Sequence, residues 1–112
     1  MRTVFISMPL IGKSKEEIEN IQNVILTSVK EYLDNDDLFV IDTYSIDKKY
    51  IDHKYSGIEY MCERLKLLAT RADCIAFFEG WENVQRCHLE HAYAEIFSIP
   101  CLYVEGVKDD NV

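Results

Sequence analysis

Short apolar segments alternate with helical ones along this chain, and this alternation is the feature that most restricts its fold. The apolar segments span residues 2–7, 38–44, 73–78 and 100–104. Apolar residues recur at helical spacing over 14–33 and 58–71, and a third helix is expected between Gly80-Trp81 and about Ser98. Strands that alternate with helices predict a parallel sheet. With right-handed crossovers and the strand order 2-1-3-4, the prediction is a flavodoxin-like or Rossmann-like three-layer α/β sandwich of four or more strands.

Local signals divide the rest of the chain. Ser14 is followed three residues later by Glu17, a capping box that starts the first helix. Residues 45–57 form the longest irregular stretch, and loops of this length in a small domain are usually functional or disordered. Its tyrosines, Tyr50 and Tyr55, are either a lid over a site or ordinary surface anchors.

The charge balance limits the partners. The chain has 20 acidic and 12 basic residues, a net charge of −8, and no basic stripe, which argues against polymeric DNA or RNA as a partner. A single nucleotide stays compatible with this charge, because helix N-termini attract anions whatever the net charge.

The remaining composition indicates one domain in a reducing compartment. We expect a single domain over residues 1–107 and a polar tail over 108–112. The start does not resemble a signal peptide, and no segment approaches about 18 apolar residues, so no membrane contact is expected. The four cysteines lie in apolar surroundings without a C-x-x-C pair, which favours free thiols in the cytoplasm. No metal or redox cofactor is implied.

Two unusual loops are expected to meet in space. In the order 2-1-3-4 the first and third strands are neighbours, so the loops 7–13 and 79–85 lie across the switch point of the sheet. Ligands of open parallel sheets bind at this position, at the carboxyl ends of the strands. The sequence therefore predicts a binding cleft between these loops.

Three motifs carry a family resemblance. They are Ser7-Met8-Pro9-Leu10-Ile11-Gly12, then Gly80-Trp81-Glu82-Asn83-Val84-Gln85-Arg86-Cys87-His88-Leu89-Glu90, then His91-Ala92-Tyr93-Ala94 with Ser98-Ile99-Pro100. In this order they resemble the nucleoside 2-deoxyribosyltransferase-like superfamily, and most closely its small branch of bacterial and phage proteins. The resemblance spans nearly the whole chain.

The resemblance implies a nucleoside or nucleotide ligand and a glutamate nucleophile. By motif the nucleophile is Glu90, whose carboxylate would attack the anomeric carbon of an N-glycoside, so that water or another base completes a hydrolase or transferase reaction. The ligand-binding residues implied by the motifs and the adjoining helix start are Ser7, Met8, Pro9, Gly12, Ser14, Gly80, Trp81, Glu82, Asn83 and Arg86. Relatives often assemble as homo-oligomers, so a homo-oligomer is expected, in the host cytoplasm if the chain is phage-encoded.

Some positions depart from the family pattern. Met8 replaces a glycine, Val84, Gln85 and Arg86 replace a small Ser-x-Gly segment, and no residue is assigned as the acid that protonates the leaving base. These changes favour a second hypothesis, a non-catalytic binder that sequesters a nucleotide-derived signal, as a phage counter-defence protein would. A third hypothesis is a regulatory interaction module with a vestigial cleft.

Plainer interpretations stand beside the functional ones. Glu90 lies four residues after Arg86 and could be an ordinary surface ion pair. Trp81 could stack on a base or pack as a lid over the helix ends. Cys87, His88 and His91 suggest a metal site or a cysteine nucleophile, but neither has the further partners that such sites need.

Overall fold

The computed structural model describes residues 2–34, 37–52, 54 and 56–106. Its strands are β1 (Arg2–Ser7), β2 (Leu38–Val40), β3 (Cys74–Phe78) and β4 (Cys101–Val104). Its helices are α1 (Lys15–Leu33), α2 (Tyr44–Ile51), α3 (Gly57–Arg71) and α4 (Gln85–Ile96), with a 3₁₀ turn, η1 (Trp81–Asn83). The strands form one parallel sheet in the order β2-β1-β3-β4. The predicted α/β fold, consistent with a flavodoxin-like or Rossmann-like sandwich, is confirmed.

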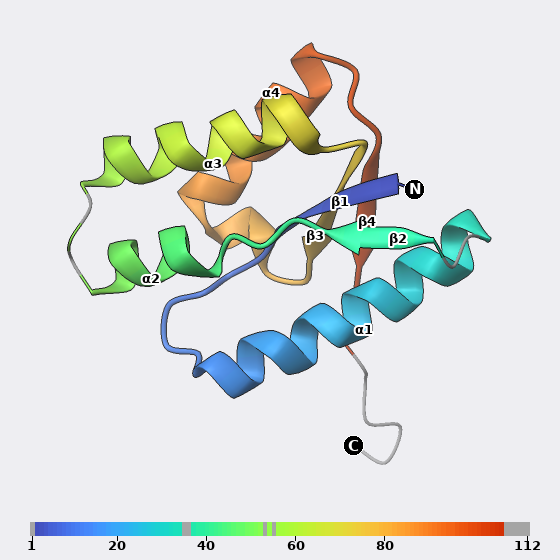
Figure 1. Cartoon of the computed structure of the whole chain (residues 1–112), viewed down its shortest axis with the longest axis horizontal. Coiled ribbons are helices and arrows are strands. Elements are labelled where there is room, and N and C mark those ends of the chain that lie inside the picture. Colours follow the sequence, from blue (N-terminus) through green and yellow to red (C-terminus); the bar gives the residue numbers. More distant parts are fainter. Residues whose placement is uncertain (1, 35–36, 53, 55, 107–112) are drawn as a thin grey trace.

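Helices cover both faces of this sheet. Figure 1 shows α1 on one side of the strands and α3 and α4 on the other, with α2 beside α3 beyond the carboxyl ends of the strands. Side chains of a strand alternate between the two faces, so Val4 and Ile6 join the core beneath α1, while Phe5 joins the core beneath α3 and α4. None of the helices in the described part of the chain is long and apolar enough to cross a membrane.

Local sequence explains where the long helices begin. Ser14 accepts a hydrogen bond from the Glu17 backbone, and the Glu17 side chain accepts one from the Ser14 backbone, so the predicted capping box is present. Ser56 and Glu59 make the same pair at the start of α3. Each box satisfies two backbone N–H groups that the first turn of a helix leaves without partners.

Two expectations about the middle of the chain were wrong. The second strand was expected over 38–44 and ends at Val40. Helix α2 begins at Tyr44 and includes residues 45–51 of the expected loop. This helix buries only Asp47 and has no side-chain cap, so it shows neither an apolar stripe nor a start signal. Tyr55 and the expected tail at 108–112 lie outside the described residues.

The buried face of α3 also differs from the apolar pattern. Ile58, placed on the buried side by helical spacing, is 79% exposed. The buried residues are Tyr60, Arg64 and Leu68, one turn apart. An arginine thus occupies the centre of a buried helix face, and its partners define the candidate site.

Candidate functional site

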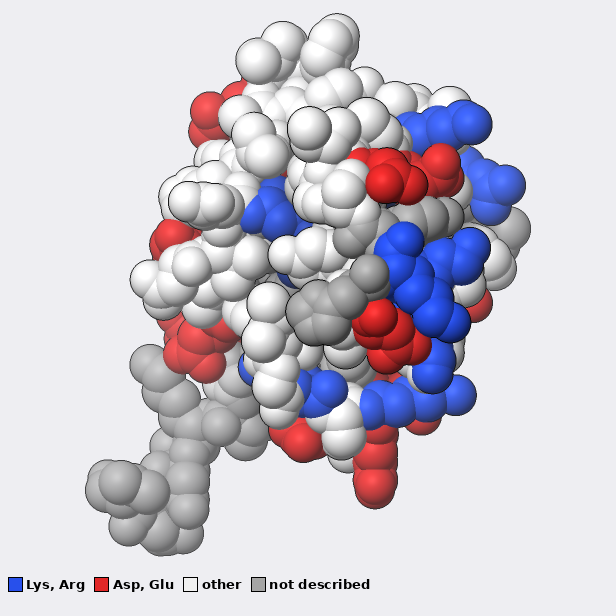
Figure 2. Space-filling view, turned by 90° about the vertical axis from the view of Figure 1, so that its left-hand side faces the viewer, with Lys and Arg blue, Asp and Glu red and all other residues white. Residues whose placement is uncertain are grey.

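A groove lies at the carboxyl ends of β1 and β3, where the cleft was predicted. It encloses about 770 Å³ between the loop after β1, the first turns of α3 and the start of α4. We call it the carboxyl-edge groove; its lining residues are Pro9, Leu10, Ile11, Tyr50, Gly57, Ile58, Tyr60, Met61, Cys62, Leu65, Asn83, Val84, Gln85, Arg86 and Leu89. Arg86 is the one charged residue among them. Figure 2 shows this end of the molecule, where a basic patch is recessed among uncharged side chains and a separate mixed-charge region lies beside it.

Glu90 lies beneath this groove and is fully buried. Its side chain is 0% exposed and accepts hydrogen bonds from three residues. Oε1 accepts from Ser7 Oγ at 2.7 Å and from Arg86 Nη1 at 3.0 Å. Arg64 donates to both oxygens, from Nε to Oε2 at 2.6 Å and from Nη2 to Oε1 at 3.2 Å. Strand β1 and helices α3 and α4 therefore meet at one carboxylate.

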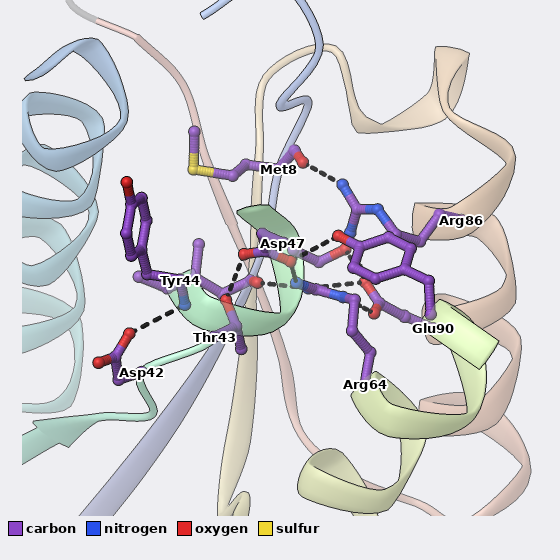
Figure 3. Close-up of polar contacts among 11 residues, drawn as sticks. Met8, Asp42, Thr43, Tyr44, Asp47, Arg64, Arg86 and Glu90 are labelled. Atoms are coloured by element: carbon purple, nitrogen blue, oxygen red, sulfur yellow. Dashed lines mark hydrogen bonds and ion pairs between the residues drawn. The ribbon is translucent and has the colours of Figure 1, made fainter. Parts of the chain in front are cut away.

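Arg64 is the centre of this arrangement. Its side chain is 1% exposed and also donates from Nη1 to Asp47 Oδ1 at 2.8 Å and from Nη2 to the Ile6 carbonyl at 3.0 Å. Figure 3 shows the guanidinium lying between the carboxylates of Asp47 and Glu90. Its Cζ is 4.7 Å from the ring centroid of Phe5, so an aromatic ring covers part of the cation.

Asp47 connects helix α2 to the same site. It accepts hydrogen bonds from Tyr60 Oη at 2.5 Å and from Thr43 Oγ1 at 2.6 Å, in addition to the bond from Arg64. Tyr50, also on α2, stacks on Tyr60 with ring centroids 4.3 Å apart and planes 5° apart. We call the connected polar residues the Arg64 network; its members are Ser7, Thr43, Asp47, Tyr60, Arg64, Arg86 and Glu90.

The charges of the Arg64 network balance. Two arginines face two carboxylates, and no buried side-chain polar atom in the described part of the chain lacks a hydrogen-bond partner. Burial alone would lower the pKa of Arg64, but the carboxylates of Glu90 and Asp47 outweigh it and raise that pKa. Burial is also the main reason that the pKa of Tyr60 is raised. Tyr60 is thus a neutral hydrogen-bond donor at physiological pH.

This geometry defines what Glu90 does in the observed conformation. The predicted Arg86–Glu90 pair is present, but it is buried and shared with Arg64 rather than a surface pair. Arg86 lines the groove and its Nη2 donates to the Met8 carbonyl, so Arg86 bridges Glu90 and the groove. Glu90 therefore orients Arg86, and both of its oxygens are occupied by donors.

The predicted site residues fall into three groups. The predicted ligand residues Pro9, Asn83 and Arg86 and the possible lid residue Tyr50 line the carboxyl-edge groove, which brings together residues from three parts of the sequence. Ser7 is buried next to Glu90. The remaining predicted residues, Met8, Gly12, Ser14, Gly80, Trp81 and Glu82, are not among those that line the groove.

Most of these other residues pack in the core, cap a helix or allow a turn. The Met8 side chain packs in the core beneath α1, and the Ser14 hydroxyl caps α1. Gly12 and Gly80 have positive φ angles of 84° and 91°, which glycine adopts without strain. Trp81 packs against Phe77 and His91 at ring-centroid distances of 4.9 and 4.7 Å. Of its two interpretations, the contacts fit the packed lid.

The metal and cysteine alternatives gain no support. Within the described residues no group of three His, Cys, Asp or Glu side chains is placed to hold a metal ion. His88 bonds the Glu82 carbonyl at 2.5 Å and His91 bonds the Tyr103 hydroxyl at 2.7 Å. Cys87 is buried, and burial raises the pKa of its thiol, which disfavours the nucleophilic thiolate. All four cysteines are free.

Sequence reasoning missed Asp47, Tyr60 and Arg64. The one available signal was the spacing of Tyr60, Arg64 and Leu68, which puts them on one face of a helix. The same helix contains more apolar residues on a neighbouring face, so the sequence predicted that neighbouring face, and not the face with Tyr60 and Arg64, as the buried one. The partners of Arg64 lie 17, 26 and 58 residues away, beyond any local pattern.

Comparison of the chain with protein-family models, curated proteins and solved structures found no match. The functional argument therefore depends on the residue motifs and on the geometry of the carboxyl-edge groove and the Arg64 network.

Proposed function

We propose that the chain binds a nucleoside or nucleotide in the carboxyl-edge groove, with Arg86 as the polar contact and Glu90 as the residue that positions Arg86. The observation that carries this proposal is the groove itself, an apolar hollow at the switch point of a parallel sheet whose lining contains a single cation. Small-molecule sites are typically apolar with a few placed polar groups, and in this fold they lie at the switch point. The motif resemblance supplies the ligand class.

The chemistry of the groove suits an aromatic base joined to a polar sugar or phosphate. Leu10, Ile11, Ile58 and Leu89 offer apolar surface for a base. Among the described contacts, Glu90 and Met8 take two of the five guanidinium N–H donors of Arg86, which leaves donors for oxygens of a ligand. An arginine that is already oriented loses less conformational entropy when it binds such a group.

The state of Glu90 favours binding without turnover. A nucleophile needs a free lone pair directed at the reacting carbon, and both oxygens of Glu90 are held by Ser7, Arg64 and Arg86. No residue is assigned as the acid that would protonate the leaving base, and this also favours binding without turnover. We therefore place the sequestering binder first.

N-glycosidic cleavage is the second candidate, and the position of Glu90 favours it. Arg86 connects Glu90 Oε1 to the groove through one hydrogen bond, so a ligand that draws Arg86 away removes one donor from this oxygen. The carboxylate would then attack the anomeric carbon as the bond to the base breaks, and water would release the sugar. The base would leave with a proton from an acid that is not assigned.

One experiment separates these functions. The purified chain is mixed with nucleosides, their 5′-phosphates and cyclic nucleotide messengers, and mass spectrometry reads the free pool and the pool released by denaturation. A binder removes an intact compound from the first pool and returns it in the second. An enzyme produces free base, and Glu90→Gln abolishes that product.

Matched variants test the site. Arg86→Gln should weaken retention of the compound at least tenfold, whereas Arg71→Gln, at an exposed arginine of α3, should leave it unchanged. Neither retention nor product from any of these compounds would overturn both candidate functions. Equal retention by the Arg86 and Arg71 variants would overturn the site.

Two broader proposals follow from the free cysteines and from the motifs. Four free cysteines fit a reducing cytoplasm, that of the host if the chain is phage-encoded. A homo-oligomer remains a proposal from the resemblance.

A further inference from the structure

Helix α2 also lines a second pocket, which shares no lining residue with the carboxyl-edge groove. This pocket encloses about 370 Å³ between the start of α1, the segment after β2 and helix α2. We call it the α1–α2 pocket; the lining residues through which it could hold a ligand are Lys13, Ile18, Gln22, Asp42, Tyr44 and Ile51. Figure 1 shows the start of α1 and helix α2 at the same end of the molecule. The proposed function makes no use of this pocket.

Asp42 follows β2 by two residues and presents a fixed carboxylate to this pocket. Its Oδ1 accepts a hydrogen bond from the Tyr44 backbone N–H at 2.9 Å, and its Oδ2 has no donor among the described residues. Figure 3 shows Asp42 and the Tyr44 ring apart from the carboxylates that bind Arg64. In nucleotide-binding domains with a parallel sheet, an acidic residue beyond the first βα unit accepts a hydrogen bond from a ribose hydroxyl. Asp42 has the position and the free oxygen for this contact.

The remaining surface of the α1–α2 pocket suits a planar base. Ile18 of α1 and Ile51 of α2 supply apolar side chains, and Tyr44 supplies an aromatic ring. Nucleobases of every kind stack on aromatic side chains. The side chains of Lys13 and Gln22 make no hydrogen bond or ion pair with the described residues, so they are available to polar atoms of a ligand. Apolar surface with a few free polar groups is typical of a small-molecule site.

The charges of the pocket favour a ligand with little net charge. Asp47 also lines the pocket, but Arg64 offsets its charge. The other charged lining residues are three lysines and three carboxylates: Lys13, Lys15, Lys48, Glu19, Asp42 and Asp52. Lys15 Nζ lies 3.8 Å from Glu19, and Lys48 Nζ lies 3.7 Å from Asp52, so two of the lysines are already paired. The pocket therefore has no excess of positive charge for a polyphosphate.

The start of α1 is also unsuited to phosphates. Helix N-termini bind phosphate through free backbone N–H groups. Here the capping box occupies the N–H groups of Ser14 and Glu17, and the first turn carries the carboxylates of Glu16 and Glu17. A chain of phosphates at this end of the pocket would meet like charges, whereas an uncharged sugar would not.

We propose that the α1–α2 pocket is a second ligand site, which takes a ribonucleoside without a chain of phosphates. The 2′- and 3′-hydroxyls of the ribose donate to the Asp42 carboxylate, whose oxygens accept several hydrogen bonds in total, and the base lies against Tyr44 and Ile51. A 2′-deoxynucleoside makes one of these two hydrogen bonds fewer, so the site distinguishes ribose from deoxyribose. This site is independent of the function proposed for the carboxyl-edge groove, because the two use different residues.

The test is the ribose preference of the full chain, measured by equilibrium dialysis. The probes are adenosine, guanosine, cytidine and uridine, each beside its 2′-deoxy counterpart. At least one ribonucleoside should bind about tenfold more tightly than its counterpart, because a hydrogen bond to a charged group contributes this much or more. Asp42→Asn should abolish the preference, since the amide is a weaker acceptor but still accepts from the Tyr44 N–H. Glu63→Gln, at an exposed carboxylate of α3 outside both linings, is the matched control and should keep the preference.

A second variant guards against effects of Asp42→Asn on the turn before α2. Ile51→Lys changes a residue of α2 that is 41% exposed, should keep the circular dichroism of the parent, and should weaken ribonucleoside binding at least tenfold. A chain that binds none of the ribonucleosides, or that binds ribo- and deoxynucleosides equally, would overturn the proposal.

The variant Arg86→Gln separates this site from the carboxyl-edge groove. It should leave the ribose preference unchanged, because Arg86 does not line the α1–α2 pocket. A preference that Arg86→Gln abolishes and that Asp42→Asn and Ile51→Lys keep would overturn the second site, since the compound would then lie in the groove. In that case the function proposed for the groove would stand.

Discussion

Replacing Arg64 with methionine should destabilise the protein more than replacing any exposed arginine. Methionine fills a similar volume but removes the four hydrogen bonds that join Arg64 to Glu90, Asp47 and the Ile6 carbonyl. Two buried carboxylates then lose their main cation. Removing one partner of a buried ion pair costs about 3–5 kcal/mol, because it leaves a buried charge without compensation.

This magnitude is large for a domain of 112 residues. Small domains unfold with free energies of about 5–15 kcal/mol, so the variant should lose a third or more of a typical value. At about 1.4 kcal/mol per tenfold change, the equilibrium constant for unfolding should rise by a factor of roughly 10² to 10⁴. Urea titration followed by circular dichroism measures this loss as a lower midpoint with an unchanged slope.

The matched control is Arg71→Met, at an exposed arginine of the same helix, which should change the free energy of unfolding by less than about 0.5 kcal/mol. A double-mutant cycle sharpens the test. Arg64→Met combined with Glu90→Gln should cost less than the sum of the single changes, because the second change removes a charge that the first left uncompensated. Equal costs for the Arg64 and Arg71 variants, or a strictly additive cycle, would refute the role assigned to Arg64.

Three smaller predictions concern the edges of the fold. The Thr3 backbone N–H and hydroxyl donate to the Asp73 carboxylate and hold the pKa of Asp73 below its usual value. The contribution of Asp73 to stability is therefore present above its unfolded-state pKa and is lost as pH falls through its folded-state pKa. Urea midpoints measured against pH should decline less steeply in acid for Asp73→Asn than for the parent, and equal slopes would contradict this. Ser56→Ala removes a capping box and should lower the free energy of unfolding by about 1 kcal/mol, and a change below 0.3 kcal/mol (about the error of a denaturation curve) would count against the cap. Gly80→Ala should lower the free energy of unfolding by about 1–3 kcal/mol, because φ at this position is 91° and the new Cβ would lie 3.4 Å from Pro9 Cγ. Gly57→Ala is the control, at a position with open space around it, and should leave the free energy of unfolding unchanged or raise it in the same denaturation assay.

Much of the fold was predictable because its signals are local. Apolar segments of strand length separated by helical periodicity gave the order of the main elements, and the Ser14–Glu17 box marked the start of α1. The parallel order β2-β1-β3-β4 was predicted as the flavodoxin-like order, with right-handed crossovers whose hand depends on backbone twist rather than on particular side chains. Helix α2 escaped prediction because a short polar helix has no periodic apolar face.

The candidate site was predicted in position but not in content. Because the carboxyl ends of parallel strands meet at one edge, the loops after β1 and β3 could be placed at a common groove, and Pro9, Asn83 and Arg86 do line it. Glu90 could be singled out by motif, yet its burial could not, since a glutamate in a helix is usually solvated.

The sequence by itself determined the layered α/β architecture and the edge at which the groove lies, because periodicity, caps and crossover handedness act over short stretches of chain. Only the tertiary structure decided that Arg64 lies between Asp47 and Glu90 and that Arg86 connects Glu90 to the groove. A buried charge is tolerated only where opposite charges and hydrogen-bond partners surround it. In this protein those partners come from β1, α2, α3 and α4, and folding alone brings them together.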